Sequence, residues 1–479
     1  MRLETLHLQN FRGYVDREFI LHPQFNLVIG ENGAGKTSFL EAAAIAIGSW
    51  LLGFRGHDSR NILDRDVRHV LEFVEKRYRE LPQYPVRVAA TGQIQIARIG
   101  RTGAHGDMGY LPASNEDKPN PREVSVRWER SIDGLGGRTT RGGANQLKKY
   151  AEALADAVLK QEPRVLPLIR YFGAGRLWES VRDTTGKALS KHKGKQPAEL
   201  AQDADELEKL FYEAKQLLEP FYGYRMSVDK RCNPDDLIRW MGVERRNELD
   251  EEDSSPALRL VYQTIEAMLP EIATARYSTK LGTVILKYQN GERHTFSELS
   301  DGYRNVVAIA ADLAIKATML NPQLAEKALE MTPGVVLIDE LDLHLHPKWQ
   351  RRIVADLRRT FPLLQFICTT HSPFLIQSLR SGEELIVLDG QPTADLGHMP
   401  VDEIARGLMG VSNTDVSQEY ERMKQVAKHY LETLEEAAIA PEDKQQAFQE
   451  TLAKAIAPYA HNPAYQAFLE MKRVAKLGE

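Results

Sequence analysis

The segment Gly30–Thr37 has the residue types and the spacing that bind a nucleoside triphosphate. It reads GENGAGKT and fits G-x-x-x-x-G-K-[ST] at every defined position. Glycines let backbone N–H groups face phosphate oxygens, the Lys36 ammonium can reach the β- and γ-phosphates, and the Thr37 hydroxyl can bind Mg²⁺. A helix predicted to begin at Thr37 adds its positive end. The candidate nucleotide-binding residues of this phosphate loop are Asn32, Gly33, Gly35, Lys36, Thr37 and Ser38.

Two carboxylates follow an apolar run far along the chain. Residues 335–338 read VVLI, and Asp339 and Glu340 come directly after them. A buried strand that ends in two acids suits a nucleotide site, with Asp339 binding Mg²⁺ and Glu340 orienting or activating the attacking water. The alternative is an ordinary strand with solvated acids at its exit. We therefore interpret Glu340 as catalytic, and Thr37 with Asp339 as metal ligands.

Two more polar segments accompany these elements. The β-rich run 365–371 ends at His371, and Pro373 prevents the strand from continuing. We interpret His371 as a contact to the γ-phosphate; the alternative is a structural histidine. The segment 296–304 leads into an apolar helical run, which Ser300 can cap. The N-terminus of that helix is a second site that favours anions.

Hydrophobic periodicity predicts the elements that must position these residues. The predicted strands cover residues 3–8, 25–29, 86–90, 94–99, 124–128, 281–288, 335–338, 366–369 and 385–390. The predicted helices cover residues 37–50, 198–218, 255–269 and 305–320, and residues 101–122 are predicted to form a surface loop. A strand, a glycine loop and a helix in this order are what phosphate-binding folds need.

Taken together, the four polar elements resemble the ATP-binding-cassette ATPase head shared by the RecF, SMC and OLD-family proteins. Residues 299–303, LSDGY, stand where that group has its LSGGQ-like signature, and residues 341–347 resemble its D-loop region. Residues 171–178 and 339–350 are similar to the stand-alone AAA-type ATPases of bacterial antiviral defence systems, above all the Septu ATPase family, PtuA. The similarity covers residues 1 to about 380 and matches the tail only loosely.

The resemblance implies an α/β fold with a mainly parallel core sheet, an antiparallel β flank, a helical signature subdomain and a helical C-terminal tail. It also implies ATP with Mg²⁺, and a homodimer in which the signature of one subunit covers the nucleotide of the other. Ser300, Gly302 and Asp342 then become candidate nucleotide-binding residues. Asp301 replaces the first signature glycine, and no glutamine can be assigned to a Q-loop.

These expectations divide the chain into four parts. They are an N-terminal ATPase lobe at 1–180, a helical insertion or lid at 181–290, a C-terminal ATPase lobe at 291–400, and a helical C-terminal region at 401–479. In the last part Met423, Val426, Tyr430 and Leu434 share one predicted helical face. One interpretation is that such faces pack on the ATPase lobes. The other is that the last stretch, residues 465–479 with Phe468, Leu469 and Val474, offers an apolar face to a partner protein.

The composition excludes several classes of protein. Lys and Arg number 62 and Asp and Glu 67, a net charge of −5, which excludes a wholly basic nucleic-acid coat protein but allows a local basic groove. Two cysteines cannot build a disulfide scaffold or a cysteine zinc site. No stretch has the roughly 18 apolar residues of a membrane span, and the charged first residues lead us to expect no secretory signal. We expect a cytoplasmic protein without a membrane partner.

Two patterns keep alternative interpretations. The basic runs at 122–149 and 187–195 are either solvated loops or contacts to a DNA backbone. His344 and His346 lie beside Asp342 in a pattern that could bind a metal. The resemblance favours packing of the D-loop instead.

Three functions remain. The resemblance favours a sensor or regulatory ATPase of an antiphage defence complex that acts with a separate HNH-type nuclease. A RecF-like ATPase of DNA repair or recombination would have a similar sequence. A self-contained OLD-like nuclease needs an Asp-x-Asp turn after a Glu-bearing strand, and no such turn follows residues 385–390.

Overall fold

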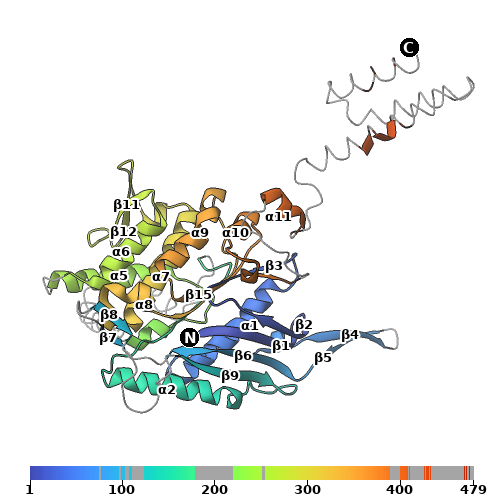
Figure 1. The fold of residues 1–479 in the computed structure, drawn as a ribbon, viewed down its shortest axis with the longest axis horizontal. Helices are drawn as coiled ribbons and strands as arrows, with labels where there is room; N and C mark the ends of the chain where they lie inside the picture. Colours follow the sequence, from blue (N-terminus) through green and yellow to red (C-terminus); the bar gives the residue numbers. More distant parts are fainter. Residues whose placement is uncertain are drawn as a thin grey trace, which may run out of the picture. The chain divides into compact units, whose positions relative to one another are not determined.

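The computed structural model describes residues 1–74, 77–95, 99–102, 107–110, 123–177, 220–250, 254–388 and 400–407, with single residues of the C-terminal segment. The chain divides into two compact units, residues 1–399 and residues 400–479. Figure 1 shows its elements coloured along the sequence. The elements that position the predicted site all belong to the first unit.

A parallel sheet forms the centre of the first unit (Figure 1). Its strand order is β10-β14-β15-β3-β16, and every neighbouring pair is parallel. The strands are β3 (Phe25–Ile29), β10 (Leu168–Phe172), β14 (Gly334–Ile338), β15 (Leu364–Thr369) and β16 (Leu385–Val387). Nearly all of their side chains are buried, as expected for a sheet covered on both faces. The predicted strands at 25–29, 335–338 and 366–369 are confirmed. The one predicted at 385–390 is confirmed over residues 385–387, ends before Leu388, and otherwise lies outside the described residues.

An antiparallel sheet lies beside it, with the strand order β2-β1-β6-β9. Its strands are β1 (Arg2–Phe11), β2 (Tyr14–Ile20), β6 (Val86–Gln95) and β9 (Glu123–Ile132). The predicted antiparallel flank is therefore confirmed, and the N-terminal strand belongs to it.

Two hairpins extend this part of the molecule. β4 (His69–Val74) pairs with β5 (Arg77–Pro82), and this hairpin projects from the body in Figure 1. β7 (Ile99–Thr102) pairs with β8 (Asp107–Tyr110). The surface loop predicted at 101–122 is therefore wrong at residues 101–102 and 107–110. Strand pairing stabilises these residues despite their glycines, and residues 111–122 lie outside the described part.

The two sheets are joined through helix α1 (Lys36–Gly48) and one glutamine. α1 contacts strands of both sheets, and its side chains are buried on every side from Phe39 onward, as expected for a helix between two layers. Trp128 of β9 donates from Nε1 to the Ala46 carbonyl at 2.9 Å. Gln365 of β15 accepts from Leu3 N at 2.7 Å and donates to Leu3 O at 2.8 Å. The phosphate loop therefore starts a helix that cannot shift without moving both sheets.

Helices cover the rest of the unit. They are α2 (Asn145–Leu159), α5 (Pro234–Asp250), α6 (Pro256–Met268), α7 (Asp301–Leu320), α8 (Ala328–Met331), α9 (Pro347–Thr360) and α10 (Pro373–Gln377). The helices predicted at 255–269 and 305–320 are α6 and α7, whereas the one predicted at 198–218 lies outside the described residues. A small antiparallel sheet contains β11 (Ile272–Ser278), β12 (Thr283–Tyr288) and β13 (Arg293–Thr295).

Short 3₁₀ turns connect these elements. They are η1 (Ser49–Gly53), η2 (Asp64–Asp66), η3 (Gly142–Ala144), η5 (Pro220–Tyr224), η6 (Phe296–Glu298), η7 (Pro322–Lys327) and η8 (Gly382–Glu384). The second unit begins with α11 (Val401–Gly407), and the helices predicted beyond it lie almost wholly outside the described residues. None of the helices described here has both the length and the apolar character needed to cross a membrane.

Candidate active site

Three neighbouring strands bring the predicted site residues to one edge of the parallel sheet. β15 lies between β14 and β3. The phosphate loop follows β3, Asp339 and Glu340 follow β14, and His371 follows β15. Ligands of open parallel sheets bind outside the carboxyl ends of the strands. These residues therefore form one candidate site.

Two glycines give the phosphate loop its backbone path. Gly33 has a φ of 91° and Gly35 a φ of 97°, and glycine adopts this left-handed region without steric cost. A Cβ at Gly35 would lie 3.0 Å from the Tyr14 hydroxyl oxygen. That hydroxyl donates to the Gly35 carbonyl at 3.1 Å, so Tyr14 of β2 holds the end of the phosphate loop in place.

The Lys36 side chain lies against the loop that precedes it. Its Nζ donates to the carbonyl oxygens of Gly30 at 2.8 Å and Glu31 at 2.9 Å. The side chain is buried, so the ammonium lies among backbone groups. Asn32 is exposed in the loop, and Ser38 lies in the first turn of α1. This places a positive charge where the loop would surround a triphosphate.

Thr37 and Asp339 are in direct contact. Thr37 Oγ1 donates to Asp339 Oδ2 at 3.1 Å, and Thr369 Oγ1 donates to Asp339 Oδ1 at 2.6 Å. The Asp339 side chain is buried. Hydroxyl and carboxylate oxygens are ligands that Mg²⁺ prefers. The donor set therefore fits the metal ion that accompanies ATP.

The backbone of Glu340 has a conformation that is rare for residues other than glycine. Its φ is 50°, and such outliers cluster at functional sites, where the surroundings hold them in place. The Glu340 N–H donates to Thr369 Oγ1 at 2.8 Å, and the Glu340 carbonyl accepts from Arg176 Nη2 at 3.2 Å. One hydroxyl of β15 thus orients the backbone of Glu340 and the carboxylate of Asp339.

The turn after β14 packs against two other segments. Asp342 accepts a hydrogen bond from Thr370 Oγ1 at 2.5 Å, which ties the turn to the end of β15. A Cβ at Gly302 would lie 2.5 Å from the His344 carbonyl oxygen. Gly302 is buried, and its lack of a side chain lets α7 approach this turn.

Ser300 marks the start of α7, but its side chain makes no capping hydrogen bond. The predicted side-chain cap is therefore wrong. Arg304 organises the turn instead, because its Nε and Nη2 donate to the carbonyl oxygens of Leu299 and Ser297, each at 2.9 Å. Ser300 is exposed. Within the described residues, no hydrogen bond joins it to the phosphate loop.

The histidines near the site differ in their surroundings. His371 is exposed at the end of β15. His346 accepts at Nδ1 from the Lys348 N–H at 3.2 Å and caps α9. Across the described parts of the chain, no group of three His, Cys, Asp or Glu side chains could hold a metal ion. The structure therefore gives no support to a metal site at His344 and His346.

Three residues of the site were not predicted from sequence patterns: Thr369, Arg176 and Asn305. Arg176 lies in the segment 171–178, which is similar to the antiviral-defence ATPases. A charged residue next to a predicted buried segment was the one sequence feature that could have indicated its role. Burial lowers the pKa of Arg176 to about 10, against the opposing effect of nearby groups that include Asp339 and Glu340. The guanidinium is therefore charged at neutral pH.

One residue of the basic run at 122–149 has a structural role. Arg130 is buried and donates to the Thr140 carbonyl and to Asn61 Oδ1, each at 2.8 Å. It is therefore not available to contact DNA. The basic cluster at 187–195 lies outside the described residues.

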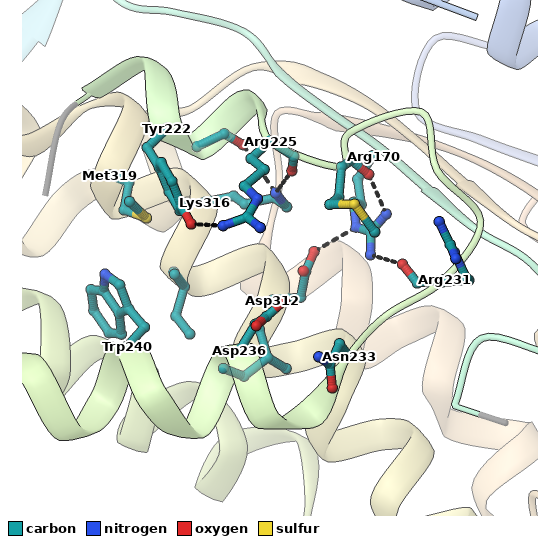
Figure 2. Close-up of a pocket in the computed structure, with 14 residues that line it drawn as sticks. Arg170, Tyr222, Arg225, Arg231, Asn233, Asp236, Trp240, Asp312, Lys316 and Met319 are labelled. Atoms are coloured by element: carbon teal, nitrogen blue, oxygen red, sulfur yellow. Dashed lines mark hydrogen bonds and ion pairs between the residues drawn. The ribbon is translucent and has the colours of Figure 1, made fainter. Parts of the chain in front are cut away.

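A pocket of about 70 Å³ lies beside α7, and no residue of the phosphate loop lines it (Figure 2). Arg170 forms a buried ion pair with Asp312 at 2.8 Å. Lys316 donates from Nζ to the carbonyl oxygens of Gly223 at 3.1 Å and Arg225 at 2.7 Å. Burial lowers the pKa of Lys316 to about 8. These charged groups bind one another and the backbone, so they anchor α7 in the fold.

Two family models match the sequence of the chain. A family model described as "AAA domain" matches residues 5–271, which is more than half of the chain. A second AAA-domain model, described together with the AbiEii toxin of type IV toxin–antitoxin systems, matches residues 180–377.

Among curated relatives, the retron Ec83 probable ATPase of Escherichia coli is 25% identical over 82% of this chain and 72% of its own length. The retron Vc95 probable ATPase of Vibrio cholerae is 34% identical, but the match spans only 32% of this chain and 30% of that protein. The Septu protein PtuA of Bacillus mycoides is 42% identical over 20% of this chain and 12% of its own.

A solved SMC head bound to the C-winged helix domain of ScpA aligns with a TM-score of 0.41 and 16% identity, over 81% of this chain and 94% of that one. The family match rests on the sequence models, which together cover the phosphate loop, both carboxylates and His371. The chain belongs to the AAA-domain family of ATPases.

Proposed function

We propose that this ATPase binds Mg-ATP at the sheet edge of β3, β14 and β15 and hydrolyses it between two copies of the chain. The contact of Thr37 with Asp339 carries the proposal, because it unites the phosphate loop and the two acids in one site. Thr37 and Asp339 hold Mg²⁺, and Glu340 takes a proton from the attacking water. The phosphates are bound by Asn32, Gly33, Gly35, Lys36, Thr37 and Ser38, with His371 at the γ-phosphate.

The second copy supplies Ser300 to this site. The exposure of Ser300 supports this, as does its lack of a hydrogen bond to the described phosphate loop of its own chain. The helix that it begins presents unpaired backbone N–H groups, which favour an anion. Asp342 lies in the turn that packs against α7 near Gly302, so this turn would lie between the two nucleotides. Hydrolysis would then be coupled to association of the copies.

We further infer that the ATPase regulates a separate nuclease, of the HNH type, in a cytoplasmic antiphage defence complex. The similarity to retron ATPases and to the Septu protein PtuA supports this role. ATP turnover in such a complex would control when the nuclease meets DNA.

A second candidate is a DNA repair ATPase. The DNA replication and repair protein RecF of Desulforamulus reducens is 35% identical over 15% of this chain, and it supports that alternative. A self-contained OLD-like nuclease is a third possibility, with no specific observation in its favour.

One reconstitution separates these functions. The purified chain and its Glu340→Gln variant are each mixed with duplex DNA and with the protein encoded by the neighbouring gene. A regulatory ATPase predicts that the neighbouring protein cuts DNA at different rates with the two chains. ATP hydrolysis stimulated by DNA alone, with cleavage unaffected, would favour the repair function. Cleavage by the chain alone would favour the self-contained nuclease.

The C-terminal region is the proposed docking segment for the partner. Deleting residues 463–479 should leave ATP hydrolysis and self-association intact and abolish co-purification with the neighbouring protein. A truncated chain that is insoluble or inactive would show that the segment completes the core instead.

A further inference from the structure

Arg176 lies at the centre of the hydrogen bonds that fix the two acids of the ATP site. Its side chain is 2% exposed. Nη1 donates to the carbonyl oxygens of Gly173 at 2.8 Å and Asp339 at 2.7 Å, and Nη2 donates to that of Glu340 at 3.2 Å. A guanidinium presents its donors in a rigid planar fork. The backbone of Asp339 and Glu340 is therefore held in one orientation relative to β10.

The remaining donor of Arg176 reaches α7. Nε donates to Asn305 Oδ1 at 2.5 Å, and both side chains are buried. Asn305 Nδ2 donates in turn to the Leu343 carbonyl at 3.1 Å, in the turn after β14. Arg176 and Asn305 therefore connect the end of β14, the following turn and the first turns of α7. Ser300 begins that same helix.

A second arginine anchors α7 without touching the site. Arg170 of β10 pairs with Asp312 (Figure 2). Asp312 is seven residues beyond Asn305, which places the two on the same face of α7. Its other donors bind the carbonyl oxygens of Tyr171, Met226, Asp229 and Arg231. Arg170 therefore provides a matched comparison: it holds the same helix from β10, whereas Arg176 lies in the turn that follows this strand, and Arg170 hydrogen-bonds to neither Asp339 nor Glu340.

We propose that Arg176 is a positioning residue that transmits rearrangements of Asp339 and Glu340, through Asn305, to the Ser300 end of α7. The inference rests on the proposed two-copy ATP site, in which α7 presents Ser300 to the nucleotide of the other copy. A charged side chain buried among hydrogen-bond acceptors specifies one arrangement of the groups around it. Binding of ATP at one site would thereby change the position of Ser300 at the site of the other copy.

The test compares Arg176→Lys and Asn305→Ala with Arg170→Lys. Lysine keeps the charge but loses the fork, so it cannot hold both carbonyls and Asn305 together. Each variant is measured for Mg-ATP affinity and for kcat. These two readings separate a positioning effect from a loss of nucleotide binding.

A third measurement reports on the position of the Ser300 end of α7. Ser297 is exposed in the turn that leads into the helix, and Cys232 and Cys368 are buried. A Ser297→Cys change can therefore be labelled selectively with a fluorophore. The signal is the change in fluorescence when Mg-ATP is added, recorded in each background.

For Arg176→Lys and Asn305→Ala we expect Mg-ATP affinity within about threefold of wild type and kcat lower by about 10- to 100-fold. The fluorescence change at position 297 should be lost in both. The double variant should be no slower than the slower single variant, since both changes break one connection. Arg170→Lys should keep kcat within about threefold of wild type.

A wild-type kcat in Arg176→Lys would overturn the proposal. An equal loss of kcat in Arg170→Lys would also overturn it, because it would show that any residue anchoring α7 has the same effect. If Arg176→Lys does not fold, Asn305→Asp decides. Aspartate still accepts from Arg176 Nε but cannot donate to Leu343, so it should retain activity that Asn305→Ala loses. An equal loss of kcat in the two Asn305 variants would overturn the proposed connection from Arg176 through Asn305 to α7. A wild-type chain that does not hydrolyse ATP would instead contradict the proposed function.

Discussion

Thr37 and Asp339 are separated by 302 residues in the sequence and joined by a hydrogen bond of 3.1 Å. The hydroxyl comes from the first turn of α1, and the carboxylate from the end of β14. In the proposed site both residues bind the metal, so that site needs β3 and β14 in the same sheet. The fold and the site are therefore formed together, and changes at the two ends of this contact should have distinct effects.

Replacing Lys36 with alanine should greatly weaken ATP binding. The variant loses a charge-assisted contact to the β- and γ-phosphates, a change of about 3 kcal/mol or about 100-fold in affinity. Calorimetric titration with Mg-ATP measures it. Lys280→Ala, at an exposed lysine in a turn, is the control and should bind normally. Retained affinity in Lys36→Ala would refute the assignment of the phosphate loop.

The Glu340→Gln variant should bind ATP and fail to turn it over. The amide keeps the shape and hydrogen bonding of the side chain but cannot take a proton, so kcat should fall by about 100-fold or more. Because ATP persists, the two copies should remain associated, which sedimentation with and without Mg-ATP would detect. Hydrolysis at the wild-type rate would show that Glu340 is not the base.

Thr369→Val should impair turnover and also lower stability. The valine has the same shape but removes the hydroxyl that donates to Asp339 at 2.6 Å and accepts from Glu340 at 2.8 Å. The buried Asp339 carboxylate and the partly buried Glu340 N–H then each lose a partner, at about 1–3 kcal/mol of the free energy of unfolding.

Thr264→Val is the matched control for this change. Thr264 is also buried, but its hydroxyl donates to the Leu260 carbonyl within α6 at 2.7 Å. Thermal unfolding and kcat are measured for both variants. Equal losses of kcat would show that any buried hydroxyl matters as much as that of Thr369.

The strands and the phosphate loop could be predicted because their signals are local. An apolar run followed by glycines and Lys36 indicates a strand, a loop and a helix without reference to any other part of the chain. Asp339 and Glu340 were found in the same way, from an apolar run that ends in acids. The family resemblance then supplied the order of the parts.

The contacts that orient these residues could not be predicted, because they join segments far apart in the sequence. Thr369 looked like any residue of a buried strand until β15 was placed between β14 and β3. Arg176 and Asn305 meet across 129 residues, and no periodicity reports such a pair. The β7–β8 hairpin was missed because its glycines favour a loop, whereas strand pairing decided the outcome.

Gly302→Ala should destabilise the protein and reduce ATP hydrolysis. The added Cβ would lie 2.5 Å from the His344 carbonyl, so α7 must move away from the turn after β14. We expect a loss of about 1–3 kcal/mol in the free energy of unfolding. Gly142→Ala, where a Cβ meets nothing within 4 Å, should stay within about 0.5 kcal/mol of wild type. Similar stabilities for the two variants would contradict the close approach of α7 to this turn.

Lys316 should make stability depend on pH above neutrality. Burial lowers its pKa from 10.5 to about 8, and Asp312 only partly opposes this effect. Below pH 8 both the folded and the unfolded chain carry the proton, so the cost of burying the charge is fully present. Between about pH 8 and pH 10.5 the folded chain releases the proton while the unfolded chain keeps it, and stability rises with pH.

A Lys316→Met variant isolates this contribution, since Asp312, Arg170 and Cys232 are present in both proteins and cancel in the difference. Denaturant unfolding is measured for both chains from pH 7 to pH 10. The free energy of unfolding of wild type relative to the variant should rise by about 2–3 kcal/mol over that range. Lys280→Met, at an exposed site, should show no such trend. If the difference in the free energy of unfolding between wild type and Lys316→Met does not change with pH, burial does not lower the pKa of Lys316. The anchoring of α7 would then have to be assigned to Arg170 and Asp312 alone.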